Sequence, residues 1–92
     1  MTRFTVLWDA EVESRFIDLW LASDSHTRTI LTDIANWVDD NLAVHPDKQG
    51  QERSDLSLRI VSVPVSSARV SVVYHVLHED RQVRVVRIVV SK

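Results

Sequence analysis

Arginines and lysines in the second half of this sequence are the side chains best suited to chemistry. Guanidinium groups bind phosphate and carboxylate oxygens in a bidentate manner, so several of them on one surface favour recognition of such an anion. Each arginine taken alone is more simply a solubilising residue on an exposed strand. We predict that part of the set converges on one face of a sheet. The candidate site residues are Arg59, Arg69, Lys48 and Arg53, with Arg84 and Arg87 as further basic side chains.

Other catalytic and metal-binding patterns are absent from the sequence. The chain has no cysteine, which excludes thiolate ligands, and of its four histidines only His75 and His78 lie close together, without a third ligand. Asp39 and Asp40 are neighbours on a predicted helix, so their carboxylates diverge and do not form an acid–base pair. No phosphate-binding loop, dinucleotide fingerprint or Ser-His-Asp set is present. We therefore predict neither a metal nor a cofactor.

The distribution of charge bears on the partners of the chain. Its formal net charge is −2, whereas a protein that grips nucleic acid usually carries a clear positive excess, because phosphate neutralisation supplies most of its affinity. From residue 56 onward, however, five arginines and one lysine stand against Glu79 and Asp80. The second half can therefore form a local basic patch.

Length and hydropathy predict a single domain over residues 1–92. Hydrophobic residues make up 45% of the chain, which is enough for a thin core. No apolar run approaches the roughly 18 residues needed to cross a bilayer, and no secretory leader pattern follows Met1. We therefore expect a cytoplasmic protein without a membrane partner.

The last third of the chain predicts an antiparallel meander. Residues 56–63, 69–77 and 83–90 form three runs rich in valine, whose branched side chains suit a pleated sheet. The breaks between the runs contain Pro64 and a His-Glu-Asp-Arg sequence, and they are short enough for direct antiparallel connections.

The first half predicts a short strand and a helical hairpin. Residues 3–8 alternate in hydropathy like a strand, and apolar residues then recur at helical spacing over about 10–22 and about 25–44. The short joint predicts antiparallel helices, and residues 45–55 predict a polar surface loop. The order β-α-α-β-β-β therefore indicates an α+β fold, with the hairpin on one face of a twisted antiparallel sheet.

Both faces of the predicted sheet are apolar. We assign Leu58 and Ile60 to the face that the helices cover and Arg59 to the opposite face. Helices of this length cover one face, so the other would expose a larger apolar surface than soluble monomers usually tolerate. Either the sheet curls and loops cover that face, or a partner does: a segment of another protein, or a second copy in a homodimer. The C-terminal strand is the predicted exposed edge, which favours strand addition.

The order of several short motifs resembles a known family. In chain order they are a strand ending in Trp8, a helix beginning Asp9-Ala10-Glu11 and carrying Leu19-Trp20, a second helix closing in His45-Pro46, then Leu58-Arg59, Val72-Val73-Tyr74, an Asp-containing turn and a Val-Arg-Ile-Val ending. The sequence is similar in this order to the RelE/ParE toxins of bacterial type II toxin–antitoxin systems, often called plasmid stabilisation proteins.

The resemblance implies a small growth-inhibiting toxin held inactive by a cognate antitoxin that wraps around it. RelE-type members cut mRNA on the ribosome, whereas ParE-type members share the fold but block DNA gyrase. In a nuclease, basic residues stabilise the phosphorane formed when a ribose 2′-OH attacks the adjacent phosphate. Arg59 matches the strand arginine of that set, and Lys48 and Arg53 correspond to the basic residues of the loop before it.

Two positions depart from the nuclease pattern. Ser71 stands where an arginine is expected before Val-Val-Tyr, although Arg69 lies two residues away on the same predicted face. The tyrosine or histidine expected near the C-terminus has no counterpart in Val89-Val90-Ser91-Lys92. We therefore favour a ParE-like gyrase poison. A RelE-like endoribonuclease and a degenerate, non-toxic relative that serves as an interaction module stay open.

Overall fold

Strands and helices follow one another in the order predicted from the sequence, with one short strand added after the helices. The computed structural model describes residues 3–53, 58–64 and 69–91. The elements are β1 (Thr5–Trp8), α1 (Ala10–Leu21), α2 (Ser25–Asn41), the 3₁₀ helix η1 (Pro46–Lys48), β2 (Gln51–Arg53), β3 (Leu58–Val63), β4 (Arg69–Leu77) and β5 (Gln82–Ser91). The first two residues of the strand predicted at 56–63 lie outside the described residues.

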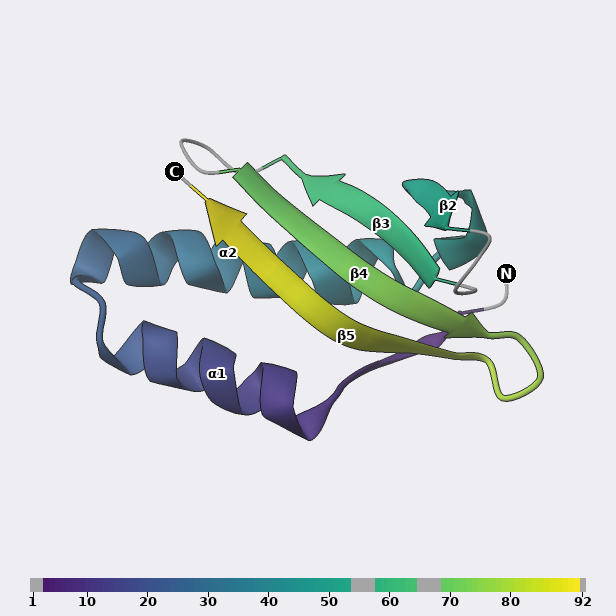
Figure 1. The fold of residues 1–92 in the computed structure, drawn as a ribbon, viewed down its shortest axis with the longest axis horizontal. Helices are drawn as coiled ribbons and strands as arrows, with labels where there is room; N and C mark the ends of the chain where they lie inside the picture. Colours follow the sequence, from purple (N-terminus) through teal and green to yellow (C-terminus); the bar gives the residue numbers. More distant parts are fainter. Residues whose placement is uncertain (1–2, 54–57, 65–68, 92) are drawn as a thin grey trace.

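The described strands form one mixed sheet in the order β1-β5-β4-β3-β2 (Figure 1). β3, β4 and β5 make the predicted antiparallel meander. β1, however, runs parallel to β5, so the prediction of a wholly antiparallel sheet is wrong at this edge. Hydropathy gives no information on the partner of an isolated strand. β1 pairs with β5 because this position places Val6 and Trp8 next to the buried Val83 and Val85.

Part of the segment predicted as a loop over residues 45–55 belongs to the sheet. β2 pairs antiparallel with β3, from Gln51 opposite Ile60 to Arg53 opposite Leu58. The strand is short and polar, so its hydropathy resembles that of a loop. β2 is thus the edge of the described sheet farthest from β1.

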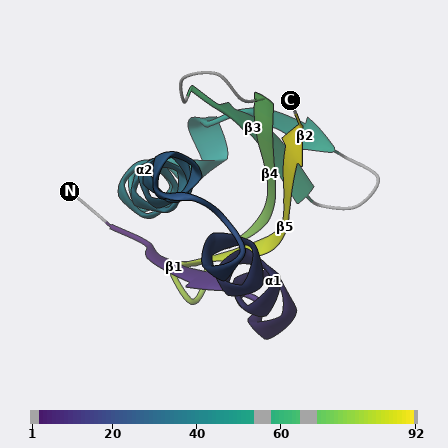
Figure 2. The ribbon, with the colours of Figure 1, turned by 90° about the vertical axis from the view of Figure 1, so that its left-hand side faces the viewer.

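The helices α1 and α2 form the predicted hairpin and lie on one side of the sheet (Figure 2). The carboxylate of Asp24 accepts a hydrogen bond from the Thr27 N–H at 2.8 Å and caps α2. Arg28 of α2 donates to the carbonyl oxygens of Trp20 and Leu21, which stabilises the end of α1. In the described part of the chain, no helix is long and apolar enough to cross a bilayer.

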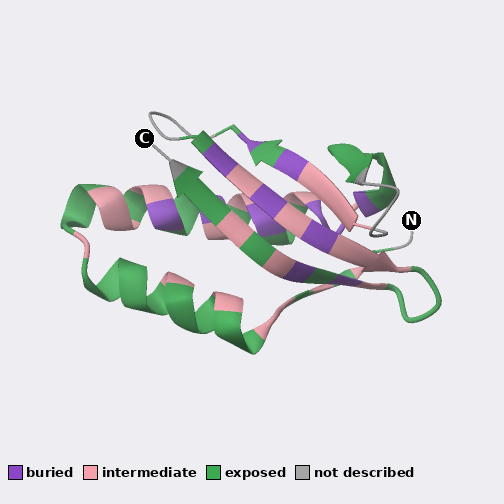
Figure 3. Cartoon of the chain, viewed as in Figure 1, coloured by how far each residue is buried: buried purple, intermediate pink, exposed green. Residues whose placement is uncertain are grey.

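α2 supplies most of the helical share of the core. Buried residues form stripes on α2 and on the strands that lie in front of it in Figure 3. The core residues from the helix and its C-terminal end are Leu31, Ile34, Val38 and Leu42, and those from the sheet are Val61, Val63, Val70, Val72, Tyr74, Val83 and Val85. None of the twelve residues of α1, all of them described, is buried.

The facing of β3 is the reverse of the prediction. Val61 and Val63 are buried against the helices, whereas Leu58 and Ile60 are half-buried on the outer face. Arg59 pairs with the buried Tyr74 across the ladder, and residues directly opposite each other share a face. Arg59 therefore lies on the helix side, not on the open face. The error arose because the apolar residues of this strand occupy both faces.

A β-bulge reverses the facing of β5 halfway along the strand. Tyr74 of β4 lies opposite Val85, but Val73 lies opposite Arg87, so that Val86 is an extra residue. Before the bulge, the odd-numbered Val83 and Val85 face the helices. After it, the even-numbered residues do, and Arg87 lies on the outer face.

Candidate functional site

Arg59 and Tyr74 hold η1 and the residues between η1 and β2 through backbone carbonyl groups. The Arg59 Nε donates to the Gln49 carbonyl oxygen at 2.9 Å, and its Nη2 lies 3.3 Å from that of Gly50. The buried Tyr74 hydroxyl lies 2.7 Å from the Pro46 carbonyl oxygen and 2.8 Å from that of Gln49. We call Arg59 and Tyr74 the loop clamp. Burial raises the pKa of the Tyr74 phenol, and the neighbouring Arg59 cation offsets part of that increase.

Gly50 lets the clamped segment approach the sheet. Its φ of 61° lies in the left-handed region that glycine adopts without strain. A Cβ at this position would lie 2.1 Å from the Ile60 carbonyl oxygen. The single glycine of the chain therefore fixes the point at which the segment becomes β2.

Of the four predicted site residues, Lys48 and Arg53 lie near Arg59 along the chain and the sheet, whereas Arg69 lies apart from it. Lys48 ends η1 and is exposed, next in sequence to the clamped Gln49. Arg53 ends β2, where its backbone pairs with Leu58. Arg69 is the first residue of β4 and precedes Tyr74, the partner of Arg59, by five residues. At roughly 3.4 Å per residue, the two positions are about 17 Å apart along the strand. Arg69 also lies on the outer face, opposite to Arg59, because its neighbour Val70 is buried.

The outer face of β4 and β5 nevertheless carries a group of basic side chains. His75 lies opposite Arg84, and Arg87 lies opposite Val73, so all of these residues share the face that the helices do not cover. Arg84 forms an exposed ion pair with Asp9, with 3.3 Å between Nε and Oδ1. We call His75, Arg84 and Arg87 the outer basic patch; Arg69 lies on the same face but at the other end of β4.

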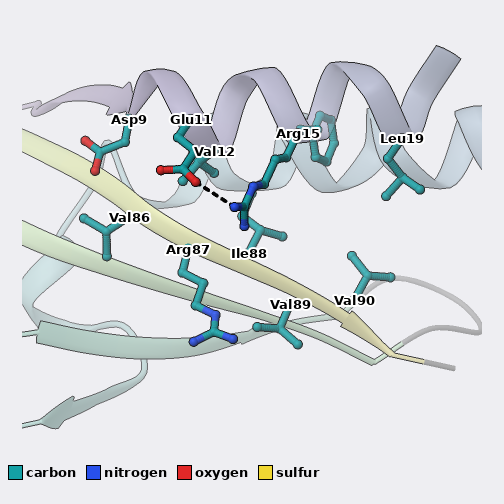
Figure 4. A pocket seen from close by; sticks show the side chains of 11 residues that line it. Asp9, Glu11, Val12, Arg15, Leu19, Val86, Arg87, Ile88, Val89 and Val90 are labelled. Atoms are coloured by element: carbon teal, nitrogen blue, oxygen red, sulfur yellow. Dashed lines mark hydrogen bonds and ion pairs between the residues drawn. The ribbon is translucent and has the colours of Figure 1, made fainter.

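A groove separates α1 from the second half of β5, and Figure 4 shows it from close by. Its volume is about 700 Å³. Val12 and Leu19 of α1 face Ile88 and Val90 of β5 across it, whereas Arg87 points to the other side of the strand (Figure 4). The residues that line this α1–β5 groove are Asp9, Glu11, Val12, Arg15, Phe16, Leu19, Val86, Arg87, Ile88, Val89 and Val90.

Apolar side chains lie on both walls of the groove, and charged side chains lie at its rim. Leu19 is 43% exposed and Val90 is 37% exposed, which is high for such side chains on the two walls of one cleft. On the rim, Arg15 pairs with Glu11 at 2.6 Å, one helical turn away. This geometry suits the binding of a chain segment rather than chemistry on a small molecule.

Sequence reasoning predicted an uncovered apolar surface but not its position. We expected it on the outer face, where Val89 is exposed, but most of the large exposed apolar side chains lie on α1, with Val90 at the end of β5 and Leu7 on β1. The signal for the bulge was present in the sequence. Val85 and Val86 are adjacent apolar residues, and the apolar pattern changes there from odd to even positions. A bulge at that point predicts that Ile88 and Val90 face the helices.

Comparison with known proteins gives one informative match. No protein-family model matches the chain, and no curated protein is significantly similar to it. The fold is similar to a solved structure of the E. coli toxin RelE in the free state, a mutant with two arginines replaced by alanine. The TM-score is 0.64 at 18% sequence identity, over 96% of this chain and 82% of that one. At this identity the likeness establishes the fold: the chain has an α+β fold of the RelE type.

Proposed function

We propose that this chain is the toxin of a bacterial type II toxin–antitoxin pair, that it stops growth by poisoning DNA gyrase, and that an antitoxin neutralises it. The fold shared with the E. coli toxin RelE supports the toxin class. The order of motifs along the sequence supports the RelE/ParE group. The choice between the two activities of that group rests on the placement of the basic residues.

The position of Arg59 is the observation that carries this choice. In a nuclease, the Arg59 guanidinium would have to be free to contact the phosphate that is attacked. Instead it donates to the Gln49 and Gly50 carbonyl groups on the helix side. Arg69 lies on the opposite face and toward the other end of the sheet. Because phosphoryl chemistry needs its stabilising groups held together around one phosphate, this separation favours a toxin that acts by binding a protein target.

A ribosome-dependent mRNA endonuclease is the second candidate, and the outer basic patch favours it. Arg84 and Arg87 are exposed and lie near one another on β5, where they can reach RNA phosphates. His75 lies beside them, and an imidazole can act as a general acid or base. In this alternative the outer basic patch, rather than the predicted set around Arg59, contacts the RNA.

Pulse labelling in bacteria separates these activities. Expression of the chain is induced, and the incorporation of thymidine and of amino acids is followed over the first minutes. The proposal expects thymidine incorporation to fall first and the purified chain to inhibit supercoiling by gyrase. An earlier fall in amino acid incorporation, with mRNA cleavage on purified ribosomes, would establish the second candidate instead.

Variants of the outer basic patch make this test residue-specific. A double variant, Arg84→Ala with Arg87→Ala, should abolish toxicity in the nuclease case, since it removes two phosphate-binding groups. Arg3→Ala is the matched control, because this arginine is also exposed but precedes β1. If the incorporation of both thymidine and amino acids continues while the unsubstituted chain is expressed, the chain is a non-toxic relative that serves as an interaction module.

A further inference from the structure

The surface of α1 that faces away from the sheet carries apolar side chains where a surface helix normally carries polar ones. α1 packs on the core through the half-buried Val12 and Phe16, and most of the helix is exposed (Figure 3). At about 100° per residue, Ile17 and Leu21 lie about 140° and 180° around the helix from Val12. They are 48% and 61% exposed. This second apolar stripe therefore does not contribute to the core.

Small side chains beside the stripe leave a depression in the surface of α1. Its volume is about 260 Å³, and it is lined by Ala10, Glu13, Ser14, Ile17 and Asp18. The first four stand at positions i, i+3, i+4 and i+7, the set that forms the hole for a side chain of a facing helix. Ser14, Ile17, Asp18 and Leu21 repeat this spacing about one turn further along. We call the surface formed by Ala10, Ser14, Ile17 and Leu21 the outer α1 face.

Side-chain packing is the interaction that the outer α1 face can make. Within a helix the backbone N–H and C=O groups bond to one another, so an extended segment would find no main-chain partners along this surface. A second helix instead inserts its side chains into holes at this spacing. The occupant that fits the outer α1 face is therefore an amphipathic helix.

Acidic residues flank the outer α1 face on both sides. Glu13 and Asp18 lie on opposite sides of the stripe, at about 100° and 240° around the helix from Val12. Neither forms an ion pair with any residue that the structure describes. A helix with basic residues beside its apolar stripe would supply the missing partners.

The rest of the helical hairpin adds to this negative charge. Residues 9–41 contain eight acidic residues and two arginines. Both arginines already have partners: Arg15 pairs with Glu11, and Arg28 donates to carbonyl groups at the end of α1. The resulting field attracts a positively charged partner to this side of the molecule.

We propose that the outer α1 face binds a basic amphipathic helix of another protein. Apolar side chains of that helix enter the two holes and cover Ile17 and Leu21, and lysines or arginines beside them pair with Glu13 and Asp18. The depression and the α1–β5 groove share no lining residue, so the two surfaces are separate. The inference goes beyond the proposed function and does not depend on it.

A second copy of the chain fits this face less well. Pairing of α1 with the α1 of another copy would place the acidic flanks formed by Glu13 and Asp18 beside one another. Like charges at the flanking positions of two paired helices oppose their association. Self-association through α1 is therefore an outcome that would contradict the proposal.

The test uses the purified chain and a synthetic probe, a capped, fluorescently labelled peptide of two heptads. Leucine occupies the two core positions of each heptad, lysine the two flanking positions and alanine the others. Fluorescence anisotropy should show saturable binding. The circular dichroism of the mixture should exceed the sum of its parts in helical signal, because so short a peptide is marginally helical alone in water. Absence of saturable binding, or binding without a gain of helix, would overturn the proposal.

Control peptides separate the three parts of the proposal. Serine in place of leucine keeps the charge, and glutamate in place of lysine keeps the apolar stripe; each should weaken binding at least about tenfold. One proline in place of a central alanine keeps both features but prevents a continuous helix, and it should abolish binding. Equal binding of the lysine and glutamate peptides would contradict the charge argument.

A matched pair of protein variants locates the site on α1. Ile17 and Leu19 are similarly exposed, at 48% and 43%, but Leu19 lines the groove on the other side of the helix. Ile17→Gln should weaken binding of the leucine–lysine peptide about fivefold to tenfold, and Leu19→Gln should leave it unchanged. The reverse sensitivity would place the peptide in the groove. If the unchanged chain sediments as a dimer that Ile17→Gln dissociates, the occupant is a second copy and the proposal is wrong.

A second matched pair tests the acidic flanks. Glu13→Gln with Asp18→Asn removes two charges beside the outer α1 face, and Asp33→Asn with Asp40→Asn removes two exposed charges from α2. At low ionic strength the first pair should weaken peptide binding about fivefold, and the second should change it by less than about twofold. Equal losses would show that net charge alone attracts the peptide, which would overturn the assignment to this face.

Discussion

The two helices cover the same sheet in different ways. α2 buries Leu31, Ile34 and Val38 against the central strands. Beyond the end of α2, the loop clamp holds the following segment against the sheet. α1 buries none of its residues and leaves Ile17, Leu19 and Leu21 between 43% and 61% exposed. We call the first region the closed side and the second, together with residues 86–91 of β5, the open side.

This difference separates the residues that maintain the fold from those available for binding. Both helices carry apolar residues at helical spacing, so hydropathy alone makes them look equivalent. On the closed side, apolar area is already removed from water and stabilises the chain. On the open side, exposed apolar side chains stay in water until something covers them. Substitutions should therefore reduce stability on the closed side and affinity on the open side.

The largest effect on stability is expected in the core of the closed side. Ile34 is fully buried in α2, and Ile34→Ala should lower the free energy of unfolding by about 2–5 kcal/mol through lost burial and a cavity. Leu19→Ala on α1 should lower it by about 1 kcal/mol or less, because the side chain is already half in water. Urea denaturation followed by circular dichroism compares the variants. Equal losses would remove the distinction between the two sides.

Gly50→Ala should have the next largest effect. The substitution places a Cβ 2.1 Å from the Ile60 carbonyl oxygen and requires alanine to adopt a φ of 61°. Left-handed backbone at a non-glycine residue alone costs about 1–3 kcal/mol, and the clash adds to this. We expect a loss of about 3 kcal/mol in urea denaturation. Gln51→Ala, at the exposed neighbouring position, is the control and should change stability by about 0.5 kcal/mol or less.

The fold could be predicted from the sequence because its local signals agree. Valine-rich runs gave β3 to β5, and β4 spans the predicted residues. The helical spacing of apolar residues placed α1 and α2 to within a few residues. The parallel pairing of β1 with β5 could not be predicted, because it depends on where the hairpin returns the chain. β2 was also missed, since its strand character comes from pairing with β3 rather than from its own side chains.

The candidate site was less predictable than the fold, and Arg59 illustrates why. Alternation gives two faces to a strand, but it does not say which face meets the helices when both are apolar. Val61 and Val63 face the helices, so Arg59 faces them too. Its hydrogen-bond partners on that side are backbone carbonyl groups. Backbone partners leave no trace in a sequence. Whether Arg59, Arg69, Lys48 and Arg53 have a role in toxicity stays a prediction.

A smaller effect on stability is expected from the loop clamp. Tyr74→Phe removes the hydroxyl that contacts the Pro46 and Gln49 carbonyl oxygens. The free energy of unfolding should fall by about 1–2 kcal/mol at neutral pH, because a hydrogen bond is lost and a carbonyl group loses its partner. Urea denaturation measures the loss. An unchanged midpoint would show that water satisfies these carbonyl groups and that the clamp is not part of the closed side.

The same tyrosine predicts a dependence of stability on alkaline pH. Burial raises the pKa of Tyr74 in the folded chain above the ordinary value of 10.0, so folding favours the neutral phenol. Its contribution is fully present below pH 10 and is lost as the pH rises through the folded pKa. Urea midpoints measured between pH 8 and pH 11 should fall less steeply above pH 10 in Tyr74→Phe than in the unchanged chain. Parallel curves would contradict this assignment.

The smallest effect on stability is expected on the open side, where a charge should be tolerated. Leu19→Glu and Ile17→Glu each replace a side chain that is more than 40% exposed, and each should change the free energy of unfolding by about 0.5 kcal/mol or less. Urea denaturation of both variants checks this. If Leu19→Glu alone unfolds the chain, Leu19 and the groove are packed in the core in solution, and α1 covers the sheet as closely as α2 does. If both variants keep their stability, the exposed apolar side chains of α1 do not maintain the fold and stay available for binding.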